Sequence, residues 1–226
     1  MGRCLEVAPL SNDGISQEGI ARLVAEPQVR WARVSERDFD SDYALLNAEE
    51  RERAGRFRYE VHRRRWVFAR GWLRRSLGEL LGVRPEAMEF CVGTLGKPYL
   101  QGYPLHFNLG HSGDLVILAW AEDREVGVDI EEVKEDFGWE DVARQAFSEA
   151  ELSYLEKVPE RERRTAFYEI WTLKEAYVKA LGCGIGIDTN EFSVKPEVRL
   201  DGKWRLRDLT VEKGYAAALA WEEGKA

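Results

Sequence analysis

The sequence contains few cysteines, and their arrangement excludes the sites that cysteines usually build. The chain of 226 residues has three, Cys4, Cys91 and Cys183, an odd number at distant positions with no C-x-x-C motif. Zinc sites and disulfide frameworks need closely spaced or paired cysteines. We therefore predict a reducing environment and a cytoplasmic location.

Long hydrophobic runs are also missing. The longest purely apolar run is LVILAWA at residues 115–121, whereas a helix needs about 20 such residues to cross a bilayer. The N-terminal residues lack the apolar stretch of a signal peptide. We expect neither a membrane segment nor a membrane partner.

Several widespread enzyme motifs do not occur. The sequence has no Walker A motif, no G-x-S-x-G motif, and no G-x-G-x-x-G motif that follows a strand and opens a helix. These absences argue against P-loop nucleotide hydrolases, α/β-hydrolases and Rossmann dinucleotide-binding enzymes.

Positive charge is scarce except in one segment. The net charge is −8, yet residues 51–75 hold ten arginines and only two glutamates. A nucleic-acid-binding protein is usually basic overall, so we expect no nucleic-acid partner. A basic segment on an acidic chain suits a small anionic ligand such as a phosphorylated cofactor. The alternative is that most of these arginines form a solvated helix face.

Hydrophobic spacing predicts two similar halves, each with long helices and a few strands. Helices are expected within 47–81, with Asn47 and Gly82 as caps, at 140–157 and at 161–181. The expected strands are 29–34, 88–92, 105–109, 115–121, 126–131, 192–194, 203–209 and 215–221. Strands 115–121 and 126–131 should form an antiparallel hairpin. The pattern predicts an α/β (α+β) fold with halves 1–123 and 124–226.

The segment VGVDIE places two carboxylates on one face of a strand. Side chains alternate along a strand, so Asp129 and Glu131 share a face with Gly127. Neighbouring carboxylates repel each other unless a cation lies between them, and Mg²⁺ commonly binds one or two carboxylates together with phosphate oxygens. We interpret Gly127 as leaving space for a ligand. Ordinary acids on an exposed strand would give the same pattern.

The segment WTLKEAYVK combines an acid with two lysines on a helix. Helical spacing places Glu175 and Lys179 on one stripe with Lys174 beside it. This face could bind a cation and a phosphate, although an exposed Glu–Lys pair has the same spacing.

Two turn-like segments contain further candidates. Gly96-Lys97-Pro98 forms a rigid loop on which a planar base could rest, with Lys97 near a phosphate. In FNLGHS we expect a turn after residue 109 that exposes His111 and Ser112 as donors to phosphate. A plain surface turn remains the alternative for both segments.

Taken in order, GKP, FNLGHS, VGVDIE and F-x-x-x-W-x-x-K-E-A-x-x-K-x-x-G resemble the Sfp-like 4′-phosphopantetheinyl transferases. The resemblance covers about residues 50–195. It implies two α/β halves related by a pseudo-twofold axis, with coenzyme A bound between them. It also implies a cytoplasmic, monomeric enzyme that uses Mg²⁺, or Mn²⁺ in its place. That enzyme would move phosphopantetheine onto a serine of an apo acyl or peptidyl carrier protein and release 3′,5′-ADP, in fatty-acid, polyketide or nonribosomal peptide synthesis.

The resemblance assigns roles residue by residue. The metal ligands would be Asp129, Glu131 and Glu175. The cofactor-binding residues would be Arg53, Arg65, Lys97, Pro98, His111, Ser112, Lys174 and Lys179. Groups acting in the chemistry would be His111, Lys179, and Glu151 as general base or Glu175 through a water.

One departure from the family pattern and two rival functions remain. Gly110 stands where the family usually has serine, which is expected to remove one hydroxyl donor to phosphate at a cost of about 1 kcal/mol. One rival is a coenzyme A-binding protein without transferase activity. The other is a nucleic-acid-binding module built on the arginine-rich helix, which the acidic remainder disfavours.

Overall fold

The computed structural model describes residues 5–6, 26–36, 38–183, 187–198 and 200–223. The strands are β1 Leu5–Glu6, β2 Gln28–Arg33, β3 Phe90–Val92, β4 Pro98–Leu100, β5 Leu105–Ser112, β6 Leu115–Glu122, β7 Val126–Glu132, β8 Trp204–Thr210 and β9 Tyr215–Glu222. The α-helices are α2 Phe39–Ala44, α3 Ala48–Gly55, α4 Glu60–Leu81, α5 Trp139–Ala146, α6 Glu149–Lys157 and α7 Glu160–Leu181, with short 3₁₀ turns at Pro85–Ala87 and Thr189–Glu191.

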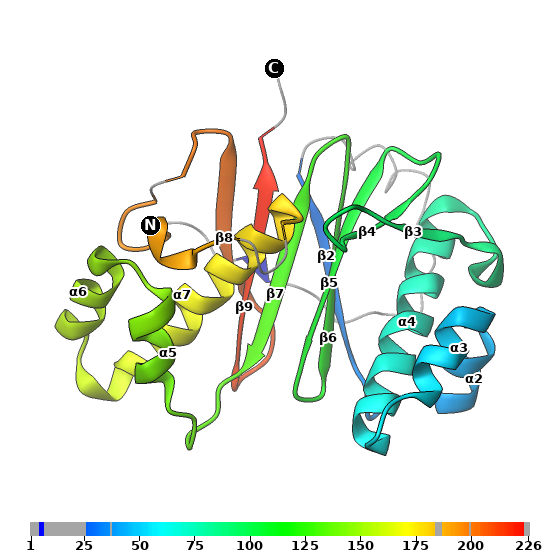
Figure 1. Cartoon of the computed structure of the whole chain (residues 1–226), viewed down its shortest axis with the longest axis horizontal. Coiled ribbons are helices and arrows are strands. Elements are labelled where there is room, and N and C mark those ends of the chain that lie inside the picture. The colour runs from blue at the N-terminus through cyan, green and yellow to red at the C-terminus, as the bar shows by residue number, and fades with distance from the viewer. Residues whose placement is uncertain (1–4, 7–25, 37, 184–186, 199, 224–226) are drawn as a thin grey trace.

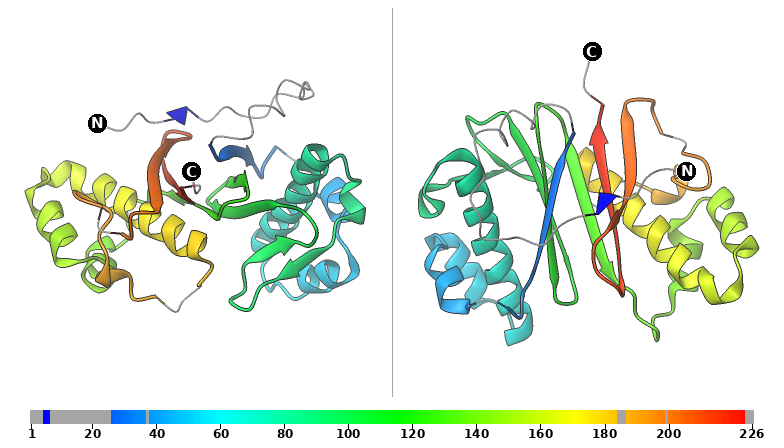
Figure 2. Two further views of the ribbon diagram at one scale, coloured as in Figure 1. Left: turned by 90° about the horizontal axis from the view of Figure 1, so that it is seen from above. Right: turned by 180° about the vertical axis from the view of Figure 1, so that it is seen from behind.

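Two sheets lie between two long helices (Figure 1). One sheet has the strand order β2-β6-β5 and the other β1-β8-β9-β7, while β3 and β4 form a separate hairpin. Helix α4 packs on the first sheet and α7 on the second, and the view from behind shows the strands side by side in the middle (Figure 2). This arrangement confirms the predicted α/β class.

The two long helices follow the same local rules. Each has 22 residues and ends at a glycine in the left-handed conformation, Gly82 with φ 67° and Gly182 with φ 69°. Glycine adopts this conformation at little cost, so it is the usual residue at such an end. Helix α3 begins with a capping box, in which Asn47 accepts from the backbone N–H of Glu50 and the Glu50 side chain accepts from that of Asn47. The predicted caps are confirmed.

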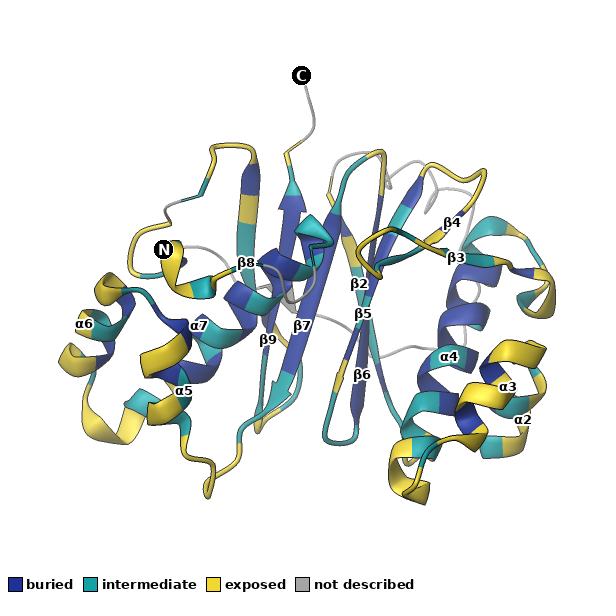
Figure 3. Ribbon diagram, viewed as in Figure 1, coloured by how far each residue is buried: buried dark blue, intermediate teal, exposed yellow. Residues whose placement is uncertain are grey.

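The buried residues form layers that match this arrangement. Figure 3 shows the central strands buried and the outer faces of α3, α5 and α6 largely exposed. Between the sheets, β6 and β7 contribute Leu115, Ile117, Val126, Val128 and Ile130 to one hydrophobic cluster. The predicted inward face of 126–131 is therefore confirmed.

Some predicted elements differ from the structure. The expected hairpin of 115–121 with 126–131 is wrong, because β6 pairs with β5 and β2 whereas β7 pairs with β9 in the other sheet. Apolar strands flanking a short polar segment also describe a chain that crosses between sheets. The single helix expected at 140–157 is divided into α5 and α6, and residues 192–194 form no strand.

A seam of alternating residues joins β5 to β7. The Asn108 side chain accepts from the backbone N–H of Val128 at 2.9 Å, and the Ser112 hydroxyl accepts from that of Glu132 at 3.1 Å. Between them, Gly110 is buried, and a Cβ there would lie 3.3 Å from the Val128 carbonyl oxygen. The FNLGHS motif therefore continues as strand through Ser112, which corrects the predicted turn after residue 109.

Gly127 has a different role from the predicted one. A Cβ at this position would lie 2.1 Å from the Ala176 carbonyl oxygen and 2.3 Å from the Ala180 amide nitrogen. Both atoms belong to the backbone of α7, so Gly127 lets the helix contact β7 and leaves no space for a ligand. This correction explains how α7 comes within reach of the acids on β7.

We expect Gly127→Ala to lower the free energy of unfolding by about 1–3 kcal/mol, the usual cost of overpacking a core. The helix backbone would have to move away from β7, so the change should also reduce activity. Gly55→Ala is the matched control, because a Cβ at Gly55 meets nothing within 4 Å. Equal stability of the two variants in urea denaturation would contradict the close contact.

Among the described residues, no helix is both long and apolar enough to cross a membrane. Cys91 and Cys183 are free thiols, and Cys4 lies outside the described residues.

Candidate active site

Three carboxylates from two elements interact electrostatically. Asp129 and Glu131 project from β7, and Glu175 from the neighbouring α7. Burial raises the pKa of Glu175, and the charges of Asp129 and Glu131 raise it further. Burial is likewise the main cause of the raised pKa values of Asp129 and Glu131. The three acids therefore share one partly desolvated environment.

Asp129 is the most enclosed of the three acids. It is 4% exposed, and its Oδ1 accepts from the Lys179 ammonium at 2.6 Å. Its Oδ2 is buried and has no hydrogen-bond partner. A buried carboxylate oxygen without a partner is costly, so it has capacity for a further ligand.

The donor set fits a hard divalent cation, although it is not closed into a ligand shell. Carboxylate oxygens are the groups that Mg²⁺ and Mn²⁺ prefer, and Asp129 Oδ2 has a free position. Within the described part of the chain, however, no three Asp, Glu, His or Cys side chains already stand as a metal-binding group. The carboxylates would have to close around an ion.

Ser112 orients one of the acids. Its hydroxyl donates to Glu131 Oε2 at 2.7 Å while it accepts from the backbone of Glu132. Both the donor and the acceptor functions of the hydroxyl are thus used inside the protein. The predicted contact of Ser112 with phosphate would need this arrangement to change.

Cationic side chains from α4 and α7 lie near His111. His111 is an exposed residue of β5, but its ring is partly desolvated, and this burial together with the positive charges of Arg65, Lys179 and His62 lowers its pKa. Like charges gathered in this way favour an anion among them. His62 was missed at the sequence level, although it lies three residues before Arg65 on α4 and so on the same helix face.

Four other arginines of this segment differ in their surroundings. Arg53 is exposed and stacks over Trp66, with its guanidinium carbon 5.5 Å from the ring centroid. Arg74 is fully buried, and both Arg70 and Arg74 donate to the Glu50 carboxylate. Arg75 pairs with Asp42. Arg70, Arg74 and Arg75 hold α2 and α3 against α4, so these three are not part of the solvated face expected for most of the arginines.

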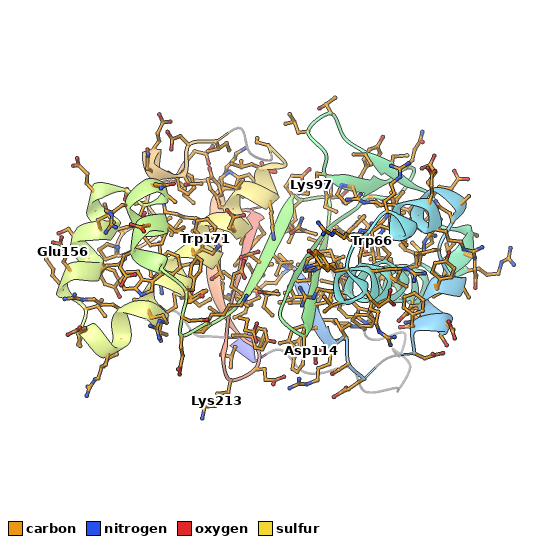
Figure 4. All side chains as sticks on the ribbon, turned by 60° about the horizontal axis from the view of Figure 1, so that its bottom comes forward. Trp66, Lys97, Asp114, Glu156, Trp171 and Lys213 are labelled. Atoms are coloured by element: carbon orange, nitrogen blue, oxygen red, sulfur yellow. The ribbon has the colours of Figure 1, made fainter. Side chains whose placement is uncertain are left out.

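A pocket of about 390 Å³ lies at the C-terminal end of α7, beside β4 and β5. Lys97 and Pro98 line it, together with Glu125 and Gly182. The Lys97 ammonium donates to Glu125 Oε2 at 2.6 Å, and to the carbonyl oxygens of Val126 and Ala180 at 3.0 Å each. Figure 4 shows Lys97 near the middle of the molecule. Because three acceptors engage its ammonium, Lys97 joins the start of β4 to β7 and α7 and is not free to bind a phosphate.

Glu125 in this pocket should make the stability of the fold depend on pH in the acidic range. Hydrogen bonds from His106 and Lys97, against the opposing effect of burial, lower its pKa from 4.5 to about 2. A lowered folded-state pKa stabilises the fold above about pH 4.5, and the contribution disappears as the pH falls toward 2. We expect Glu125→Gln to be less stable than wild type at pH 6, and the difference to shrink between pH 4.5 and 2. A pH-independent difference in urea denaturation would contradict this origin.

A second pocket, of about 350 Å³, opens beside Glu131. Aromatic side chains form much of its wall: Phe137, Phe167, Tyr168 and Trp171. Glu131, Glu132 and Lys134 supply its polar rim. An elongated, mostly apolar group next to the acids could bind here.

Comparisons with known proteins decide the family. Residues 29–123 match the N-terminal region of 4′-phosphopantetheinyl transferase, and residues 125–220 match the 4′-phosphopantetheinyl transferase superfamily. The 4′-phosphopantetheinyl transferase HetI of Nostoc sp. is 34% identical over 186 residues, which is 78% of each chain. The chain belongs to the 4′-phosphopantetheinyl transferase superfamily. The predicted family and the predicted class of enzyme are confirmed.

One further relative of this transferase agrees. The 4′-phosphopantetheinyl transferase of Bacillus subtilis is 32% identical over 157 residues, 69% of each chain. Among solved structures, the holo-[acyl-carrier-protein] synthase of Thermotoga maritima is 26% identical, covers 45% of this chain and 64% of its own, and superimposes with a TM-score of 0.36.

Two residues that the family resemblance assigned to the active site of this transferase lie in the protein interior instead. Lys174 and Glu151 are both fully buried and form an ion pair of 2.8 Å. The Lys174 ammonium also donates to the carbonyl oxygens of Thr189 and Phe192. No part of Lys174 is exposed to reach a pyrophosphate, and the predicted common face with Glu175 and Lys179 does not include it.

The position of Glu151 does not support its predicted role as the general base. Its Oε1 accepts from the backbone of Val194, and its Oε2 accepts from the backbone of Ser148 and pairs with Lys174. A general base must come within hydrogen-bond reach of the proton that it takes. Glu151 instead caps α6 and ties it to the segment that follows α7.

Gly110 does not mark a lost phosphate donor in this transferase. The position is buried, and a Cβ there would lie 3.1 Å from Ile117 and 3.6 Å from the Asp129 Cα. A serine would press against β6 and β7 rather than into an open site. The expected loss of about 1 kcal/mol in cofactor binding is therefore not supported by the geometry.

Proposed function

We propose that this transferase moves 4′-phosphopantetheine from coenzyme A to a serine hydroxyl of an apo acyl or peptidyl carrier protein, with Mg²⁺ or Mn²⁺ bound by Asp129, Glu131 and Glu175. The observation that carries the proposal is the meeting of these acids with a cationic cluster at the junction of the halves. One side of that junction provides ligands for a cation and the other attracts phosphates.

The parts of coenzyme A match successive parts of the site. The planar base suits the pocket lined by Lys97 and Pro98, and the phosphates suit Arg65, His111 and Lys179. Arg53, stacked on Trp66, is a further candidate for the 3′-phosphate. The pantetheine arm suits the aromatic pocket beside Glu131. Halves 1–123 and 124–226 then each contribute to substrate binding.

The reaction joins the serine oxygen of the carrier to the phosphorus that bears pantetheine. The bond from that phosphorus to the bridging pyrophosphate oxygen breaks, and 3′,5′-ADP leaves. When bound, the cation would neutralise charge on the pyrophosphate oxygens. Lys179 and His111 add fixed donors near the same charge. With Glu151 enclosed, Glu175 is the remaining candidate, directly or through a water, to take the serine proton.

The partner and setting follow from the same proposal. An acidic carrier would be attracted to those exposed arginines of residues 51–75 that coenzyme A does not engage. We propose a monomer in the cytoplasm, with no membrane or nucleic-acid partner.

Mass spectrometry of the carrier tests the function. Incubation with coenzyme A, Mg²⁺ and an apo carrier should add one phosphopantetheine to the carrier, and the carrier with alanine at its serine should stay unchanged. Binding of coenzyme A without any mass increase on several carriers would favour the coenzyme A-binding protein instead. Addition of a metal chelator should stop the reaction.

A further inference from the structure

A hydrogen-bonded triad lies on the wall of the pocket at the end of α7. The Glu125 carboxylate accepts from Lys97 through Oε2 at 2.6 Å, and its Oε1 lies 3.0 Å from His106 Nδ1. All three residues line the pocket of about 390 Å³. Because a bond holds each oxygen, the carboxylate has a fixed position.

The carboxylate retains capacity for a ligand. Each ionised oxygen can accept about two hydrogen bonds, and the two contacts above use one on each. The Glu125 side chain is 39% exposed, which leaves part of it open to the pocket. It is negatively charged at neutral pH because its pKa is about 2, so it can only accept. A ligand group in contact with it must therefore be a donor.

The other walls of this pocket suit a flat ring. Leu95, Pro98, Tyr99 and Tyr103 line it, and the residue exposures of Leu95, Tyr99 and Tyr103 are 59%, 45% and 41%. Apolar and aromatic surfaces left open to solvent bind planar aromatic groups well. Of the parts of coenzyme A, only the adenine base is both flat and aromatic.

The position of the pocket is consistent with that occupant. Glu125 directly precedes β7 and lies six residues before Glu131, which corresponds to about 20 Å of extended chain. Asp129 lies between these two ends. Lys179 contacts Asp129 and precedes Gly182, which lines the pocket, by three residues at the end of α7. A base bound here would have its phosphates directed toward the cationic cluster and its pantetheine toward the acids.

We propose that Glu125 accepts a hydrogen bond from the exocyclic amino group of adenine and so selects that base, with Lys97 and His106 as positioning residues. This inference rests on the proposed function, because coenzyme A is the ligand considered. A hydrogen bond to a charged acceptor corresponds to a preference of about 10-fold or more over a base that lacks the amino donor.

Steady-state transfer kinetics with two substrates test the inference. The substrates are coenzyme A and its analogue with purine in place of adenine, which lacks only the amino group. Wild type should prefer coenzyme A by about 10-fold in kcat/KM, mainly through KM. Glu125→Ala should reduce this preference toward one, whereas Glu122→Gln, a nearby exposed carboxylate outside the pocket, should retain it.

A purely structural role of Glu125 gives a different result. In that case Glu125→Ala would lower kcat/KM equally for both substrates and leave the preference intact, which would overturn the inference. If wild type transfers neither substrate, the proposed function fails, and calorimetric binding of 3′,5′-ADP and its purine analogue still decides the base preference. Equal binding of these two nucleotides by wild type would also overturn it.

Discussion

Replacing Asp129 with asparagine is expected to lower the rate of transfer by about 10²-fold to 10³-fold while the fold stays intact. The carboxylate is proposed to hold a cation that stabilises several kcal/mol of developing charge, and each 1.36 kcal/mol corresponds to tenfold in rate. The amide removes the charge but keeps the size. The mass increase on the carrier, followed over time, measures the effect.

The free energy of unfolding of Asp129→Asn should rise or stay unchanged. Asp129 is almost fully buried and burial raises its pKa, so its charge is not well solvated in the folded protein. Neutral asparagine removes that cost, and substitution of a functional residue often raises the stability of the fold. Asp141→Asn is the control, because this carboxylate is exposed on α5 and should affect neither activity nor stability. Full activity of Asp129→Asn would refute its role as a metal ligand.

Replacing Lys174 with methionine is expected to lower the free energy of unfolding by about 3–5 kcal/mol, the typical effect of leaving one member of a buried ion pair alone. Glu151 would keep its charge without its partner, and two carbonyl oxygens would lose their donor. Urea denaturation followed by tryptophan fluorescence measures the change.

Two further variants make this test specific. Lys157→Met changes an exposed lysine on α6 and should stay within about 0.5 kcal/mol of wild type. Adding Glu151→Gln to Lys174→Met should recover part of the loss, because no unpaired charge then remains. If Lys174→Met retains wild-type stability and loses only coenzyme A affinity, Lys174 contacts the cofactor after all.

The sequence was sufficient to predict features that depend on local periodicity. Alternation along β7 separated Val128 and Ile130 from Asp129 and Glu131, because a strand has a period of two. The glycine ends of α4 and α7 were predictable for a similar reason, since the left-handed conformation favours one residue type.

Features that depend on distant contacts could not be predicted in this way. Nothing in residues 115–131 shows that β6 and β7 belong to different sheets, because the decisive partner β9 lies about 90 residues further on. The burial of Lys174 depends on Glu151 and on the segment after α7, and charged residues are rarely buried unless paired. The role of Gly127 likewise follows from the position of the α7 backbone.

The metal site is the claim on which the account depends most, and binding of Mn²⁺ in place of Mg²⁺ tests it directly. Calorimetric titration with and without coenzyme A should show one ion per chain, bound more tightly with coenzyme A, since phosphate oxygens would complete a ligand set that the carboxylates leave open. Glu175→Gln and Asp129→Asn should each weaken Mn²⁺ binding by about 10-fold or more. Each variant removes a charged ligand, and a tenfold change corresponds to only about 1.4 kcal/mol. Mn²⁺ affinity that is the same in wild type and in both variants would contradict the account.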